Sequence, residues 1–156
     1  MQVQRIRTVA FSWMLVVIGA ASLISFTSPS GADSYQVYLN KKLIIQEFIS
    51  TSSSPKTFQL DKNNYNGEID VAYSHCGAAG KNRTIKITDP SNRVLKEWKF
   101  GDAKDVKSLM NVKVRDVLLA QKDAPVNTIN LYYSSGQLPN GKMLVSINLV
   151  DSRTRP

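Results

Sequence analysis

Residues 129–149 have the sequence INLYYSSGQLPNGKMLVSINL. Apolar and more polar side chains alternate over residues 129–134 and again over residues 143–149. A period of two residues is typical of a β-strand that buries one face. Between the two runs, Pro139-Asn-Gly141 offers the positive φ angles that tight hairpins need. The stretch therefore predicts a β-hairpin that turns at Asn140 and Gly141.

The same period recurs along the chain, so this hairpin is one part of a larger β structure. The predicted strands cover residues 35–40, 43–49, 57–60, 68–73, 85–87, 94–100, 129–134 and 143–149. Asp89-Pro-Ser-Asn92 lies between two of them and predicts a second hairpin. Many short strands separated by turns, without alternating helices, are typical of a sandwich or barrel. The fold class is therefore all-β: an antiparallel β-sandwich, immunoglobulin-like or related, with about eight strands.

One segment, residues 103–122, breaks the strand pattern. Val106, Leu109 and Met110 recur at helical spacing, and Val112 and Val114 then alternate. The segment predicts a short helical turn, a strand, and a second short helix over residues 116–121. We therefore expect one or two short helices beside the strands.

The first 32 residues have the composition of a secretory signal peptide. Two arginines precede an apolar centre over residues 9–26, and Ser30 and Ala32 fit the small-residue rule for a cleavage site. Cleavage after Ala32 would place the protein in the periplasm or outside the cell. An uncleaved membrane anchor is the alternative, because the apolar centre approaches the ~20 residues that span a bilayer. We expect a single domain over residues 33–150 and a flexible tail over residues 151–156.

The composition limits the chemistry that the chain can perform. The 156 residues include one His and one Cys, with 20 Lys plus Arg against 12 Asp plus Glu, a net charge of +8. These counts exclude an intrachain disulfide scaffold and any site within one chain that needs two histidines or a Cys-x-x-Cys pair. Residues 81–115 hold 10 basic and 4 acidic residues, a net charge of +6.

This basic segment, residues 81–115, is the predicted contact surface. In a hairpin of residues 84–100, we expect Lys86 and Lys99, with Lys96, to share the outer face, and Trp98 to be suited to stacking on a sugar ring. Such a face attracts acidic glycans, lipid headgroups or envelope proteins, but an exported chain is not expected to meet nucleic acid. Alternatively, Trp98 belongs to the core and the lysines form a solvated edge. The predicted anion-binding residues are Lys81, Arg83, Lys86, Lys96, Trp98 and Lys99.

Residues 73–84, YSHCGAAGKNRT, bring the only His, the only Cys, two glycines and two cations into one loop. Its backbone N–H groups could form an anion-binding nest over residues 77–83. Cys76 and His75 could instead bind a soft metal such as copper, helped by Met110 or Met143. Cys76 could also be a reactive thiol whose thiolate is favoured by nearby cations. The simplest interpretation, which the composition favours over these three, is a plain hairpin loop with Cys76 as a small buried apolar residue.

These features predict a non-catalytic binding or structural module of the cell envelope or exterior, with the basic segment as its contact surface. Copper handling through Cys76 and His75 is the first alternative. The second is a small hydrolase that uses Glu68, Asp70 or His75, since paired carboxylates on one face of a strand are suited to acid–base work. We expect no catalytic residues and no resident cofactor.

Overall fold

The computed structural model describes residues 31–49, 54–122 and 126–150. The predicted tail lies outside these residues, and so does the predicted signal peptide apart from Gly31 and Ala32. The strands described below belong to the unit that starts at Gly31. Within the described ranges, no helix combines the length and the apolar character needed to cross a membrane.

The described residues form an all-β sandwich of nine strands, which confirms the fold class predicted from the sequence. The strands are β1 (Ser34–Leu39), β2 (Lys42–Phe48), β3 (Lys56–Leu60), β4 (Glu68–Ser74), β5 (Thr84–Thr88), β6 (Val94–Lys99), β7 (Met110–Lys113), β8 (Thr128–Ser135) and β9 (Leu138–Leu149). The helices are a short 3-10 helix, η1 (Lys62–Asn64), and an α-helix, α2 (Val114–Lys122).

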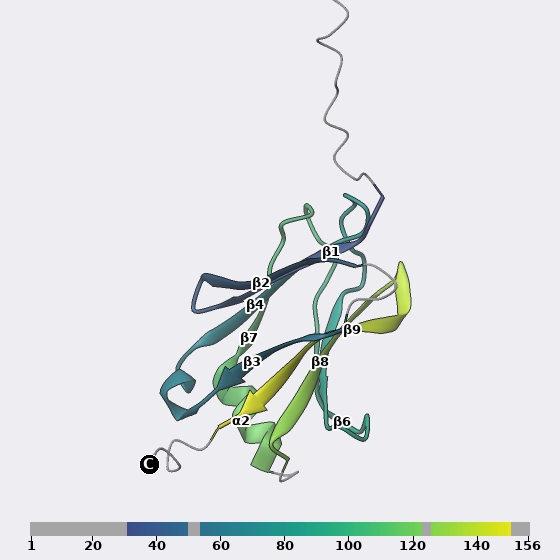
Figure 1. The fold of residues 1–156 in the computed structure, drawn as a ribbon. Coiled ribbons are helices and arrows are strands. Elements are labelled where there is room, and N and C mark those ends of the chain that lie inside the picture. The colour runs from purple at the N-terminus through teal and green to yellow at the C-terminus, as the bar shows by residue number, and fades with distance from the viewer. Residues whose placement is uncertain (1–30, 50–53, 123–125, 151–156) are drawn as a thin grey trace, which may run out of the picture. The chain divides into compact units, whose positions relative to one another are not determined.

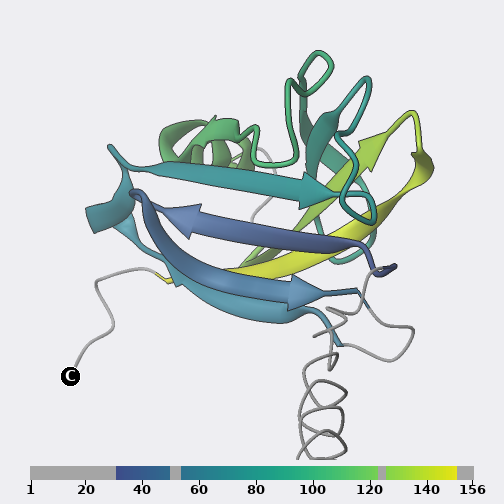
Figure 2. The same ribbon diagram turned by 90° about the horizontal axis from the view of Figure 1, so that it is seen from above.

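The strands form two sheets, which appear as separate layers in Figures 1 and 2. The four-stranded sheet has the order β2-β1-β4-β7, and the five-stranded sheet has the order β3-β9-β8-β5-β6. Neighbouring strands are antiparallel except for β3, which runs parallel to β9. Helix α2 contacts β6 and β7, an edge strand of each sheet.

Alternation along the strands sends one face of each sheet into a shared core. Val37 pairs with Val71 in one sheet, and Ile87 pairs with Leu131 in the other; all four side chains are fully buried. Because the side-chain period is two, burying one face fixes which residues point outward. The core therefore determines which of the predicted site residues share a surface.

The hairpin between β8 and β9 turns earlier than predicted. Ser135 pairs with Leu138, so the turn is Gly136-Gln137, and the predicted turn residues lie inside β9. Gly141 has a φ of +71° beside the register shift opposite Tyr133–Ser135. The prediction was wrong because a glycine with positive φ serves a β-bulge as well as a tight turn.

Residues 103–109 do not form the predicted helical turn. They are bends and a turn, in which the Asp105 side chain accepts the N–H of Lys107 at 2.7 Å. A short polar side chain that bonds its own backbone favours a turn over a helix, which explains the difference. The predicted strand and second helix are present as β7 and α2. Helix η1 was not predicted; Asp61 caps it by accepting the N–H of Asn63 at 2.9 Å.

Candidate functional site

The β5–β6 hairpin places two of the predicted anion-binding lysines on the outer face of the five-stranded sheet. The residues on either side of Lys86 are fully buried, so Lys86 points outward. In the hairpin register, Lys86 pairs with Glu97 and Thr84 pairs with Lys99. Lys99 is 84% exposed, and its Nζ lies 3.9 Å from a carboxylate oxygen of Glu97. The outer face thus carries two cations with one carboxylate between them.

Lys96 and Trp98 lie on the opposite face of β6. They pair with Ile87 and Ile85, which are fully buried. Lys96 Nζ lies 5.5 Å from the centroid of the Trp98 ring and 3.7 Å from a carboxylate oxygen of Asp116 in α2. Contrary to expectation, Lys96 does not share the face of Lys86, because alternation turns residues 96 and 98 towards α2. Trp98 packs against the core, as the alternative interpretation had it.

Tyr132 is the aromatic residue that accompanies Lys86. The two residues pair between β5 and β8, and Lys86 Nζ lies 5.4 Å from the centroid of the Tyr132 ring. The Tyr132 hydroxyl donates to Asn92 Oδ1 at 3.2 Å, which ties the ring to the β5–β6 turn. Sequence reasoning did not single out this residue, although the alternation over residues 129–134 placed it on the polar face of its strand.

Hydroxyl and amide side chains continue this outer face across β8 and β9. Thr128 Oγ1 donates to Asn148 Oδ1 at 3.1 Å, and Ser146 Oγ donates to Asn130 Oδ1 at 2.9 Å. These cross-strand pairs hold the polar groups in fixed positions. We call this surface the Tyr132 face, defined by Thr84, Lys86, Glu97, Lys99, Thr128, Asn130, Tyr132, Ser134, Ser146 and Asn148.

The loop between β4 and β5 uses its polar groups internally. Arg83 is 7% exposed, and it donates from Nε to Gly101 O at 3.0 Å and from Nη1 to Ser108 O at 2.8 Å. The N–H groups of residues 77, 78, 81 and 82 all donate to acceptors of the chain itself. These four N–H groups and the buried guanidinium therefore do not form an anion nest, and Arg83 instead supports residues 101–108. Lys81, in the same loop, is exposed.

His75 is surrounded by polar side chains. Its Nε2 lies 3.0 Å from the hydroxyl of Tyr133 and 3.0 Å from the hydroxyl of Ser135, and its Nδ1 lies 3.5 Å from Asp33 Oδ2. Tyr73 donates to the same Asp33 oxygen at 2.7 Å, and its ring stacks on that of Tyr133 with centroids 4.2 Å apart. This His75 network joins the residue before β1 to the ends of β4 and β8.

Burial and hydrogen bonding set the protonation of the network. Burial raises the pKa of both Tyr73 and Tyr133, so their hydroxyls stay protonated at neutral pH. Burial by itself also raises the pKa of Asp33. Hydrogen bonds from Tyr73 and Cys76, together with the nearby His75, outweigh that effect and lower the pKa of Asp33 below its ordinary value of 3.8.

Ser135, His75 and Asp33 have the connectivity of a hydrolytic triad, which the sequence alone could not select from its many serines. Ser135 is 5% exposed, however, and its Oγ also accepts the N–H of Leu138 at 3.2 Å. A nucleophile must reach the substrate, and the low exposure of Ser135 opposes this role. The geometry therefore favours a structural role for the network.

Cys76 lies at the tip of the loop and is exposed, not buried as the plain-loop alternative supposed. Its φ is +50°, and its thiol donates to Gly31 O at 3.2 Å and to Asp33 Oδ1 at 3.3 Å. The hydrogen bond to Asp33 raises the pKa of Cys76, which opposes a reactive thiolate. Met110, a proposed helper in copper binding, is fully buried in β7. Among the described residues, no group of three or more His, Cys, Asp or Glu side chains is placed to hold a metal ion.

The paired carboxylates of β4 lie on the face of the strand opposite the buried Ile69 and Val71, and their surroundings differ. Asp70 is buried and accepts a hydrogen bond from Asn111 Nδ2 at 2.8 Å. Glu68 pairs with Lys113 and lines a shallow pocket of about 210 Å³ that Asp70 does not reach. The two carboxylates therefore do not converge on one cleft, as acid–base catalysis by the pair would require.

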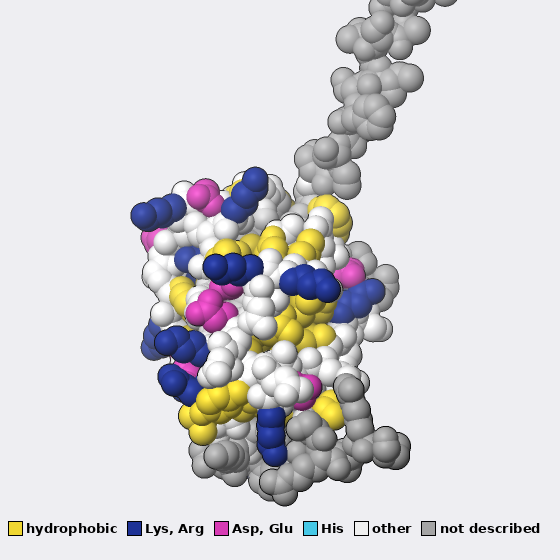
Figure 3. All heavy atoms as spheres, turned by 90° about the vertical axis from the view of Figure 1, so that its left-hand side faces the viewer, with side chains coloured by type: hydrophobic (Ala, Val, Ile, Leu, Met, Phe, Trp, Pro, Cys, Tyr) yellow, Lys and Arg dark blue, Asp and Glu magenta, His cyan; other side chains and the backbone are white. Residues whose placement is uncertain are grey.

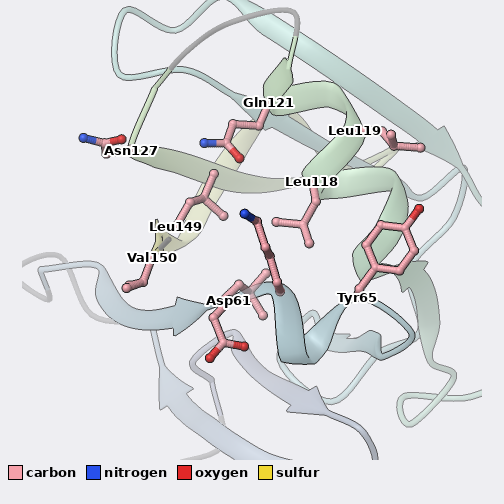
Figure 4. A pocket seen from close by; sticks show the side chains of 10 residues that line it. Asp61, Tyr65, Leu118, Leu119, Gln121, Asn127, Leu149 and Val150 are labelled. Carbon is pink, nitrogen blue, oxygen red and sulfur yellow. The ribbon is translucent and has the colours of Figure 1, made fainter. Parts of the chain in front are cut away.

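A larger pocket, which the sequence did not indicate, lies between α2 and the ends of β3 and β9 (Figure 4). Its volume is about 620 Å³, within the range of about 300–1,000 Å³ that is usual for small-molecule sites. Most of the surface that lines it is apolar. The lining residues are Leu60, Asp61, Lys62, Tyr65, Leu118, Leu119, Gln121, Asn127, Leu149 and Val150.

The charge of the basic segment does not gather into one patch. Arg83 is buried, Arg93 pairs with Asp89 at 3.0 Å, and Lys96 faces α2. Figure 3 shows the side of the molecule that lies to the left in Figure 1, and there too basic side chains are interspersed with acidic and hydrophobic ones. Two surfaces of the described residues combine groups suited to a ligand, namely the Tyr132 face and the apolar pocket.

Comparison of the chain with models of protein families and with curated proteins found no match.

Proposed function

We propose that the protein is a non-catalytic binding module of the cell envelope or exterior that binds acidic glycans on the Tyr132 face. The observation that carries the proposal is the Lys86 ammonium above the ring of Tyr132, with Lys99 on the neighbouring strand. A sugar presents C–H groups that pack on an aromatic ring, and its carboxylate or sulfate groups attract ammonium groups.

The neutral part of the face favours a glycan over other polyanions. Asn130, Ser146 and Asn148 present amide and hydroxyl groups in two neighbouring strands. Such groups both donate and accept hydrogen bonds, as recognition of sugar hydroxyls requires. A surface that attracts polyanions by charge alone would not need these amide and hydroxyl groups.

Glu97 limits the charge of the face. It lies between Lys86 and Lys99 in the hairpin register and is 42% exposed. Exposed ion pairs contribute little free energy, and salt screens the attraction between their charges. We therefore expect binding of moderate affinity that weakens as salt rises and that depends on Tyr132 as well as on the lysines.

The proposal is tested by measuring affinity for heparin and for alginate, with dextran as the neutral reference, at low and at high salt. The Lys86→Glu/Lys99→Glu variant should bind both acidic glycans at least about tenfold more weakly, because it replaces two attractive charges with two repulsive ones. Tyr132→Ala should lose about as much, because an aromatic anchor contributes about 2 kcal/mol or more.

The matched control is Lys42→Glu/Lys113→Glu, which makes the same change in net charge at exposed lysines of β2 and β7 in the other sheet. It should bind nearly as tightly as the unchanged protein. Equal losses in the two double variants would reduce the effect to net charge and refute a site on the Tyr132 face. Absence of binding by the unchanged protein would refute the proposal as a whole.

A further inference from the structure

The pocket between α2 and the ends of β3 and β9 forms where these elements diverge. Strand β3 ends at the fully buried Leu60, whose carbonyl accepts the N–H of Val150 at 2.9 Å and so closes the floor. The chain then turns into η1, and Tyr65 follows on the rim. Gln121 Nε2 donates to Val126 O at 2.8 Å and anchors the far end of α2. The walls are therefore held by hydrogen bonds of the chain.

The interior of the pocket combines leucines with a lysine, because Lys62 lines it as well. In Figure 4, Leu118 from α2 and Leu149 from β9 point into it from two sides. The Asp61 carboxylate points away from the leucines, and it is occupied by the N–H and the Nδ2 of Asn63 at 2.9 and 3.1 Å. The amide side chains of Gln121 and Asn127 lie at the opposite end from Asp61.

We infer that this pocket binds the acyl chain of a small amphiphile. The leucine side chains that point into the pocket suit a hydrocarbon chain, which gains free energy by leaving water, and no carboxylate is turned towards them. Amide groups at one end suit a polar headgroup, because ligand sites usually combine an apolar lining with a few polar groups that orient the ligand. The volume of about 620 Å³ matches a small molecule.

This site is separate from the Tyr132 face, so the inference does not rest on the proposed glycan function. The pocket is lined by residues of the β3–β4 connection, α2 and the end of β9, and it includes none of the residues that define the Tyr132 face. The exposed apolar residues of its rim, Tyr65, Leu119 and Val150, are each 41–42% exposed. A bound acyl chain would cover them.

The test uses the full chain with dodecanoate and with a single-chain dodecyl phosphocholine, below their critical micelle concentrations. Binding is measured by calorimetry and mapped by amide chemical shifts. Leu118→Gln, which puts an amide in the centre, should weaken binding of both probes at least tenfold. Leu118→Trp, which fills the pocket, should do the same, and melting curves show that each variant is folded.

The control is Leu43→Gln, the same substitution at a 42% exposed leucine of β2 outside the pocket, and its affinity should be unchanged. Tighter binding of dodecanoate would identify free fatty acids as the source of the chain, and tighter binding of the phosphocholine would identify acyl lipids. Three results would overturn the inference: no binding of either probe, equal losses in Leu118→Gln and Leu43→Gln, or self-association in sedimentation equilibrium that Leu118→Gln abolishes. The last result would assign the pocket to a second copy of the chain.

Discussion

At the scale of single residues, one carboxylate organises the chemistry of the β4–β5 loop. Asp33 accepts hydrogen bonds from Tyr73 and Cys76 and faces His75. The same carboxylate raises the pKa of Cys76, so the only thiol of the chain is held in its protonated form. His75 and Cys76, which looked reactive in the sequence, are therefore engaged in interactions with the Asp33 carboxylate.

Replacing Asp33 should make stability depend less on pH. Its pKa is lowered in the folded state, so the ionised carboxylate stabilises the fold above its ordinary value of 3.8, and this contribution disappears as pH falls through the lower folded value. Asp33→Asn should cost about 1–3 kcal/mol at neutral pH, as hydrogen bonds to charged groups typically do. Urea unfolding over a pH series should show the gap between the two proteins narrowing below about pH 4.

Tyr73→Phe is the companion variant, because it removes the strongest donor to Asp33 and leaves the carboxylate in place. The pH dependence of its free energy of unfolding should lie between that of the unchanged protein and that of Asp33→Asn. If the free energies of unfolding of the unchanged protein and of Asp33→Asn differ by the same amount down to acid pH, the lowered pKa of Asp33 in the folded state is wrong.

At the scale of elements, Gly141 introduces a bulge into β9 and so shifts its register with β8. Gly141 keeps the positive φ that marked it as a turn residue, yet it lies inside the strand, next to Lys142, which pairs with Tyr133. The bulge adjusts β9 beside the strand that carries Tyr132 outward and Tyr133 inward. The face of these two tyrosines thus depends on the register that the bulge maintains.

Gly141→Ala should destabilise the protein by about 1–2 kcal/mol, since positive φ is costly for a residue with a Cβ. The added Cβ would also approach the Tyr133 carbonyl oxygen to 3.1 Å. Gly136→Ala is the matched control, because Gly136 is outside the positive-φ region and its added Cβ would meet nothing closer than 3.6 Å. Thermal unfolding should show little change for the control, and equal destabilisation by both substitutions would argue against a strained bulge.

At the scale of the whole molecule, few polar groups cross between the sheets. The buried hydroxyl of Tyr35 in β1 donates to the carbonyl oxygen of Leu144 in β9 at 2.7 Å. The His75 network is a second polar link, because His75 follows β4 and bonds to the hydroxyls of Tyr133 and Ser135 in β8. One directional contact of this kind fixes how the layers face each other, whereas apolar packing alone is tolerant of small shifts.

Tyr35→Phe should lower the free energy of unfolding by about 1–3 kcal/mol, because it leaves a buried carbonyl without a donor. Tyr38→Phe is the control in the same strand, since the Tyr38 hydroxyl donates only to the partly exposed Gln36 side chain at 2.8 Å, and it should change stability by less than about 0.5 kcal/mol. Urea unfolding followed by fluorescence and circular dichroism should show one transition for each protein. Separate transitions for the two signals would mean that the sheets unfold independently, contrary to a shared core.

The sequence by itself determined the all-β class, the eight predicted strands, the strand and helix of residues 110–122, and the hairpin at Asp89–Asn92. These features follow from a period of two residues and from local turn chemistry, which depend only on neighbours along the chain. Alternation also placed Lys86 and Tyr132 on the outward faces of their strands. Export and glycan binding stay predictions.

Only the tertiary structure decided which outward residues meet. The pairing of β5 with both β6 and β8 brings Lys86 to Tyr132 and separates it from Trp98, and strand order is a long-range property that periodicity does not encode. The same holds for the apolar pocket, whose walls come from segments far apart in the chain. Charge counted along the segment 81–115 overstated a basic patch, because burial and ion pairing divide that charge among different surroundings.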